Sequence, residues 1–494
     1  MKKFFAALAT TILLSTNTTF AADGMSLSLE EAISLALKNN RTIEQSAEDR
    51  EAARWNLSAV RRNSGLIFSW SSTFYHIGGR FYRRNYRDRH DAFKFATKVD
   101  PLNYNVKLTP SYDNENSNSF TLRMNLYTGG RLENQREAAR YGLNYADLLL
   151  ENSRQQIKYQ AASSYYQVLQ QASLVDVQKQ AVEVLQEHLR NVTTQYEVGT
   201  VAKSDMLSTS VQLANSQQAL NTAQGNYQNA VARLNNVLGL PVDTEIAASD
   251  KINFVKYNLT EAQCLEYALA HRPDGIAASY SVKRAAADTK AVKSGFRPSV
   301  SAVVRGEISG EGFMKADHNP ERWSVGVEMN WNIFDNGITS AQVKQYKAAE
   351  RKAESIARQQ LETIELEIHS AYINLKTSEK NIETTAAAVA KAEEEFEIAK
   401  VRYVEGVDTN LNVMNAQEKV VETRSNYYAA LYTYNTSRAQ LEKAMGVPVL
   451  IDAKIYTEAE QSGKSSPKSL EAAEVTQVNY LDPTNWELPS AFDK

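Results

Sequence analysis

The chain has 494 residues and a formal net charge of −3, so nothing in its overall charge favours binding to nucleic acid. Its one cysteine, Cys264, excludes a disulfide framework within a single chain and a cysteine-based metal cluster. Only 20 glycines and 10 prolines occur, while Ala, Gln, Asn, Glu and Lys are plentiful, which is typical of a helix-rich protein.

The N-terminus has the pattern of a secretory signal peptide. Two lysines precede an apolar run at 4–14, and Ala21-Ala22 supplies the small residues of a cleavage site. That run is too short for a membrane-spanning helix, so an anchor is the weaker interpretation. We expect residues 1–21 to be removed on export. No later stretch of the sequence approaches the roughly 20 apolar residues of a membrane helix, so strands would have to cross any membrane.

The sequence contains an internal repeat. Three glycines recur 207 residues later: Gly130, Gly199 and Gly239 correspond to Gly337, Gly406 and Gly446. The flanking residues also match, as in Leu-Gly-Leu-Pro-Val (238–242) and Met-Gly-Val-Pro-Val (445–449). Such a fixed offset predicts a tandem duplication. We place the first repeat at 22–242, the second at 243–450 and a C-terminal tail at 451–494.

Each repeat is expected to contain three helices. Ser28 and Glu31 form a capping box at the start of the first one. In the longest helix of each repeat, apolar residues recur in steps of three and four, which indicates a coiled-coil seam. Some 65 helical residues would span roughly 100 Å. The two shorter helices of a repeat, stacked end to end, would run alongside the long one. The predicted helices are 29–62, 131–197 and 203–238 in the first repeat and 260–293, 338–404 and 410–445 in the second.

Four segments alternate between apolar and polar residues, which predicts strands with one dry and one wet face. They are 66–76, 119–127, 298–307 and 322–334. Such a sheet could form a soluble sandwich or an outer-membrane barrel, and strands of about ten residues favour the barrel. Known bacterial barrels start at eight strands, so several chains would have to close it. The polar face, which would line the lumen, carries Arg123, Asn125, Arg305, Glu307, Glu328 and Asn330. These charges have mixed signs, so strong selectivity is not expected there.

The doubled architecture resembles the TolC-type outer-membrane efflux proteins. The resemblance rests on Ser-Gly before the paired strands, an aromatic residue and then Gly after them, Tyr-x-x-Gly turns and Leu-Gly-Leu-Pro closers, and it covers Leu27 to about Val449. It implies a mainly α protein with a membrane β-barrel. Three copies would form a 12-strand barrel and a 12-helix periplasmic tunnel. It also implies a cell outer membrane location, a periplasmic adaptor (membrane fusion protein), an inner-membrane pump, outer-membrane lipid and no cofactor.

Two turns would then form the periplasmic mouth of the tunnel. Gly199 and Gly406 suit the left-handed residue that ends a helix. The resemblance makes the exposed residues around them candidate adaptor contacts, although a tight turn without a partner remains open. These tip residues are Val198, Gly199, Thr200, Glu405, Gly406 and Val407.

The resemblance also implies a gate at these turns. Family members usually carry aspartates six and nine residues after the second glycine, where this chain has Asn412 and Asn415. A ring of asparagines is polar but uncharged, so tight cation plugging is not expected. Asp408 could supply a displaced acidic ring, or it and Asp205 could simply be acids favoured at helix N-termini. The gate candidates are Asp205, Ser208, Tyr403, Asp408, Asn412 and Asn415.

Two further segments remain open. The arginine-rich stretch 80–90, which contains Tyr82 and Tyr86, could bind lipid phosphates as an external loop or could be merely solvated. The tail at 451–494 could wrap the tunnel or be disordered. Six histidines without metal spacing and no phosphate-binding loop argue against an enzyme. We therefore expect an export duct of a tripartite efflux or type I secretion system. The alternatives are a structural outer-membrane tether and a periplasmic coiled-coil protein without transport.

Overall fold

The computed structural model describes residues 25–76, 114–310 and 322–447. The predicted signal peptide, the arginine-rich stretch 80–90 and the tail at 451–494 lie outside the described residues. The chain forms two compact units, and each unit takes segments from both sequence repeats. We call them the helical unit, with described residues 25–44, 152–272 and 365–447, and the sheet unit, with 45–76, 114–151, 273–310 and 322–364.

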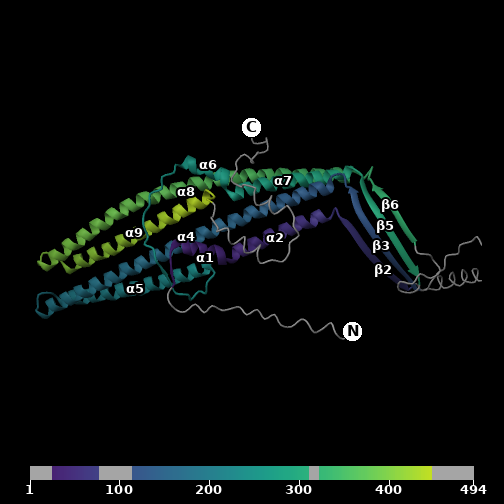
Figure 1. Ribbon diagram of the computed structural model, residues 1–494. Helices are drawn as coiled ribbons and strands as arrows, with labels where there is room; N and C mark the ends of the chain where they lie inside the picture. Colours follow the sequence, from purple (N-terminus) through teal and green to yellow (C-terminus); the bar gives the residue numbers. More distant parts are fainter. Residues whose placement is uncertain (1–24, 77–113, 311–321, 448–494) are drawn as a thin grey trace, which may run out of the picture. The chain divides into compact units, whose positions relative to one another are not determined.

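The longest helices are α4 (Arg131–Glu197) and α8 (Ile338–Val404), with 67 residues each. Each turns sharply into a second helix, α5 (Lys203–Leu238) or α9 (Asn410–Ala444), so that each repeat contributes one helical hairpin (Figure 1). Both ends of α4 lie 207 positions before those of α8, the offset seen in the sequence. The long helices span the predicted ranges, and α9 ends one residue before the predicted boundary.

The first helix of each repeat is not continuous, and its prediction as one helix was wrong. The first repeat has α1 (Leu29–Asn39) and α2 (Arg41–Arg62), and the second has α6 (Glu261–His271) and α7 (Pro273–Lys293). Asn40 and Arg272 are extended, with ψ of 127° and 120°. Arg272 precedes a proline, which disfavours the helical conformation. The Asn40 side chain accepts from the Thr42 amide at 2.9 Å and so begins a new helix.

These breaks pack against the ends of the short hairpin helices. Gly239, at the end of α5, has φ of 71°, and a β-carbon there would lie 2.8 Å from the carbonyl oxygen of Asn39. Gly446, after α9, has φ of 72°, and its β-carbon would lie 2.8 Å from the α-carbon of Arg272. Only glycine allows both the backbone angle and this close approach. The repeated Leu-Gly-Leu-Pro and Met-Gly-Val-Pro segments thus fix equivalent junctions.

The core of the helical unit includes a two-stranded parallel sheet that the sequence did not indicate. It pairs β1 (Met25–Leu27) with β4 (Ile246–Ala248). Tyr165 is fully buried against it, and its hydroxyl lies 2.8 Å from the Leu27 carbonyl and 2.9 Å from Asp250 Oδ2. Three-residue strands are too short to show a period, which is why the pattern missed them.

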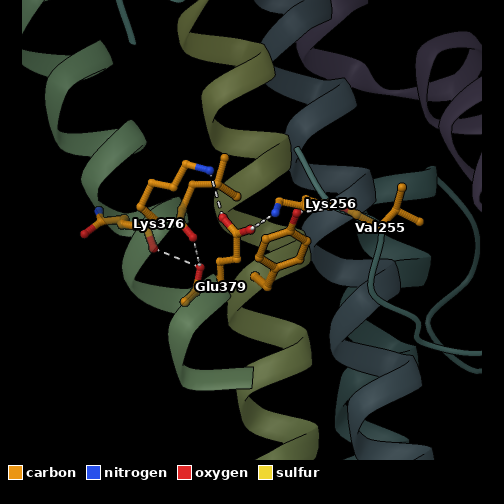
Figure 2. A network of polar contacts seen from close by, with 8 residues as sticks. Val255, Lys256, Lys376 and Glu379 are labelled. Atoms are coloured by element: carbon orange, nitrogen blue, oxygen red, sulfur yellow. Dashed lines mark hydrogen bonds and ion pairs between the residues drawn. The ribbon is translucent and has the colours of Figure 1, made fainter. Parts of the chain in front are cut away.

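A polar network holds residues 253–256 of the helical unit onto α8 and α9. Figure 2 shows Glu379 between two lysines: Lys376 Nζ donates to it at 2.8 Å, and Lys256 Nζ lies 4.0 Å away. The Tyr434 hydroxyl donates to the Val255 carbonyl at 2.6 Å. These contacts tie the linker between the repeats to the second hairpin.

The sheet unit contains one antiparallel sheet with the order β2–β3–β5–β6. Its strands are β2 (Leu66–His76), β3 (Asn114–Tyr127), β5 (Ser299–Gly310) and β6 (Arg322–Asn330). Strands β3 and β5 are longer than predicted, and β6 ends four residues before the predicted 334. It ends opposite the first residue of its partner, because Asn330 pairs with Ser299, where β5 begins. Asp335 then accepts hydrogen bonds from the amides of Gly337 (3.0 Å) and Thr339 (2.7 Å), which starts α8.

The two faces of this sheet differ as the alternation predicted. One face carries large apolar side chains that the chain itself leaves exposed: Trp323 is 76% exposed and Phe68 is 66% exposed. The opposite face carries mostly Ser, Thr, Asn and charged side chains, with Ile67 and Val303 as apolar exceptions. Strands β2 and β6 each pair on one side only within the described sheet. An exposed apolar face and two open edges indicate a sheet completed by other molecules. Among the helices of the described segments, none is long and apolar enough to cross a membrane.

Candidate functional site

The two hairpin tips share one backbone geometry. In the first, the Gly199 amide donates to the Tyr196 carbonyl and the Thr200 amide to the Gln195 carbonyl, both at 2.9 Å. In the second, Gly406 donates to Tyr403 at 3.0 Å and Val407 to Arg402 at 2.9 Å. Both glycines are left-handed, with φ of 81° and 71°, and the bonds form the Schellman motif that ends helices. All six predicted tip residues are exposed: Val198, Gly199, Thr200, Glu405, Gly406 and Val407.

Side chains from the two tips meet at one buried asparagine. Asn410, the first residue of α9, is only 5% exposed. Its Nδ2 donates to the Thr209 hydroxyl at 2.9 Å and to the Asp205 carbonyl at 3.2 Å, and its Oδ1 lies 2.7 Å from His188 Nε2. A buried amide with both ends paired fixes the position of one helix against its neighbours. We call these contacts the tip seam.

Tyr403 adds a second set of contacts to the tip seam. Its hydroxyl donates to Gln195 Oε1 at 2.9 Å, and its ring meets that of His188 edge-on, with 5.4 Å between centroids. Burial raises the pKa of the Tyr403 hydroxyl, and the nearby Asp205 carboxylate raises it further. The hydroxyl therefore stays protonated and remains a hydrogen-bond donor throughout the neutral pH range.

The polar partners of Asp408 in the described chain all belong to the second tip. Its carboxylate accepts from the Asn412 side chain and from the Thr409 amide, and Oδ2 lies 3.5 Å from Arg402 Nε. These hydrogen bonds, with Arg402 as a smaller contribution, lower the pKa of Asp408 below the usual carboxyl range. Asp408, Asn412 and Asn415 line one open groove of the second hairpin, together with Arg402 and Lys419.

The gate candidates therefore separate into two groups. Asp205 and Tyr403 belong to the tip seam, and Ser208 lies at its margin, with its hydroxyl 3.5 Å from Asn410 Nδ2. The other three, Asp408, Asn412 and Asn415, lie on the groove of the second hairpin. No local pattern in the sequence selects Asn410, because its partners lie more than 200 positions away. Reasoning from sequence also missed His188, Gln195 and Thr209.

Charged residues on the polar face of the sheet converge on Glu328. Its Oε1 lies 2.6 Å from Arg305 Nη1 and its Oε2 lies 3.1 Å from Arg123 Nη2. Asn125 accepts from the Ser301 hydroxyl at 3.1 Å. The other two predicted positions make only long hydrogen bonds: Glu307 accepts from the Ser117 hydroxyl at 3.4 Å, and the Asn330 carbonyl accepts from the Ser299 hydroxyl at 3.3 Å.

Comparison with known proteins places this geometry in a family. The family described as outer membrane efflux protein matches residues 32–240 and 264–447, one stretch in each repeat. The chain belongs to this family, whose members are outer-membrane efflux channels rather than enzymes. It is thus an efflux channel of the outer membrane, as the resemblance implied.

Individual relatives agree with this assignment. The chain is 25% identical over 327 residues to the outer membrane efflux protein BepC of Brucella suis, which covers 64% of this chain and 70% of that protein. It is 22% identical over 450 residues to the outer membrane protein TolC of Escherichia coli, which covers 86% and 84%. The fold is similar to the CmeC outer membrane channel of Campylobacter jejuni, with a TM-score of 0.71, 18% identity and coverage of 87% and 89%.

Proposed function

We propose that this protein is the passive exit duct of a tripartite efflux pump or a type I secretion system. The observation that carries the proposal is the open four-stranded sheet, with one exposed apolar face, one polar face and two open edges. Four strands are too few to enclose a conduit, since bacterial barrels start at eight. Three copies would supply twelve strands, with the apolar face toward lipid and the polar face toward a lumen.

The helical hairpins support the same assembly. Each chain offers two hairpins of unequal helices, and each junction of the short helices is fixed by a left-handed glycine. In a trimer, the four helical rods of each chain would form a twelve-rod tunnel into the periplasm. The tunnel would open at the tips, where Val198 is 70% exposed and Val407 is 66% exposed. Exposed valines on rigid turns suit contact with a periplasmic adaptor, which would connect the duct to an inner-membrane pump.

The tip seam would act as the gate of this duct. Asn410 and Tyr403 tie the second tip to the first through hydrogen bonds and a ring contact. A small displacement of one hairpin would break these contacts. A partner that binds the exposed tips would shift the two tips toward a separated arrangement only if it binds that arrangement more tightly than the closed one. Asn412 and Asn415 would present a neutral, polar rim, and Asp408 would contribute the acidic charge there.

Two measurements test the proposal. The mass of the detergent-solubilised protein should correspond to three chains, and a photo-crosslinker at Val198 or Val407 should capture a periplasmic adaptor in cells that express the intact pump. A crosslinker at Trp55, which is 59% exposed in the sheet unit, provides the control. A monomeric particle would contradict the duct. A trimer that captures no adaptor and never conducts would instead support a structural tether.

A further inference from the structure

The polar face of the sheet carries a charged cluster that joins three strands. Glu328 on β6 is bridged by Arg305 on β5, at 2.6 Å, and by Arg123 on β3, at 3.1 Å. Each carboxylate oxygen serves a different arginine. The three side chains are 40–51% exposed, so they are partly fixed by one another yet open to solvent.

The strand register explains how these residues reach one another. Val303 pairs with Arg123 on one side and with Gly326 on the other. A β-carbon at Gly326 would meet nothing within 4 Å, so this position leaves space on β6 between the Arg305 and Glu328 levels. Val303 is only 4% exposed although it lies on the polar face. The side chains of Arg305 and Glu328 thus meet across the register row of Val303, which is buried, and Gly326, which has no side chain.

The charges of the polar face have mixed signs, which is why the sequence indicated no strong selectivity, but this cluster carries a net positive charge. Two guanidinium groups share one carboxylate, which leaves one positive charge per chain. Thr121 and Ser324, the register partners of Arg305, are uncharged. Glu307 and Arg322 lie directly opposite each other in the register, and their charges cancel. Each guanidinium has five N–H donors, so donors remain for a second oxygen anion.

We propose that Arg123, Arg305 and Glu328 form an anion-selecting cluster in the wall of the conduit, which favours solutes bearing a carboxylate, sulfonate or phosphate. This inference rests on the proposed function, because it requires the polar face to line the lumen. Rings of arginine select for anions in pores, and guanidinium groups bind planar oxyanions through paired hydrogen bonds. Three copies around an axis would place three such clusters at one level of the barrel.

The test is the reversal potential of the reconstituted protein in planar bilayers under a KCl gradient. Replacing both arginines (Arg123→Gln with Arg305→Gln) changes the cluster from +1 to −1 and should lower the chloride-to-potassium permeability ratio by about twofold or more. Replacing the acid (Glu328→Gln) changes it to +2 and should raise the ratio. Opposite shifts separate an effect of charge from a loss of sheet stability.

A charge-preserving variant provides the control. Exchanging Arg305 and Glu328 (Arg305→Glu with Glu328→Arg) keeps the net charge and should leave the permeability ratio within about twofold of wild type. All shifts should shrink in 1 M salt, where the Debye length is about 3 Å. Conducting variants that share the wild-type ratio at low salt would overturn the cluster's role. Absence of conduction from the wild-type trimer would overturn the proposed function itself.

Discussion

The two hairpin tips have the same backbone but different side-chain chemistry. Both close with the same pair of hydrogen bonds around a left-handed glycine, 207 positions apart. In the first tip, the residue before α5 is Ala202, which provides no side-chain cap. In the second, Thr409 caps α9, Asp408 accepts two hydrogen bonds, and Asn410 enters the seam. The duplication thus preserved the turn, while its two copies acquired different roles.

Among substitutions that distinguish the two tips, Asn410→Ala is expected to have the largest effect on tip docking and conductance. The change removes a buried side chain and leaves the Thr209 hydroxyl and the His188 ring nitrogen without that partner, at a cost of about 1–3 kcal/mol in tip docking. We expect more frequent or larger conductance steps in planar bilayers. The matched control is Lys203→Ala at the equivalent exposed position of the first tip, which should leave conductance unchanged. Equal effects of the two variants would remove the distinction between the tips.

The shared backbone predicts equal losses at the two tip glycines. Gly199→Ala and Gly406→Ala each place a β-carbon on a left-handed residue with nothing within 4 Å, so each should cost about 1–2 kcal/mol of stability. Gly239→Ala should cost more, because its β-carbon would lie 2.8 Å from the Asn39 carbonyl oxygen. Thermal unfolding of the three variants checks this order. A Gly239→Ala protein as stable as Gly199→Ala would contradict it.

Tyr403→Phe should produce a smaller change. It removes the hydrogen bond to Gln195 but keeps the ring contact with His188, so we expect a loss of about 0.5–1.5 kcal/mol. Conductance should increase less than in Asn410→Ala. Tyr196→Phe, at the equivalent position of the first tip, is the control and should have no effect. A change in conductance in Tyr196→Phe but not in Tyr403→Phe would show that Tyr403 does not hold the tip seam.

The smallest expected effect is that of pH on Asp408. Because the folded protein lowers this pKa, the stabilising contribution of the carboxylate is complete above the ordinary value of about 3.9 and is lost as pH falls through the lower folded value. Conductance should therefore not respond to Asp408 titration between about pH 5 and 8. Replacing its donor (Asn412→Ala) should move the pKa toward its usual value, which NMR titration of the carboxyl carbon can measure. An unchanged pKa would exclude the Asn412 contact as its cause.

The sequence predicted the long-range features of the fold well. Apolar residues in steps of three and four indicated α4 and α8, which are 67 residues each, and alternation indicated both faces of the sheet. The sequence did not predict the breaks at Asn40 and Arg272. The proline after Arg272 is a local signal for the second break. The first depends on the Asn40 side chain and on the close packing of Asn39 against Gly239 at the end of α5. The contacts of the tip seam also could not be predicted from the sequence. Nothing local to Asn410 indicates which face of the first hairpin it will meet.

The conductance of the purified protein in planar bilayers tests the central claim most directly. The account predicts discrete conductance steps from a trimeric preparation, small or infrequent for the wild type and larger or more frequent for Asn410→Ala. It would be contradicted by a trimer that inserts into the bilayer, as shown by protease protection of its strands, but gives no steps in either form.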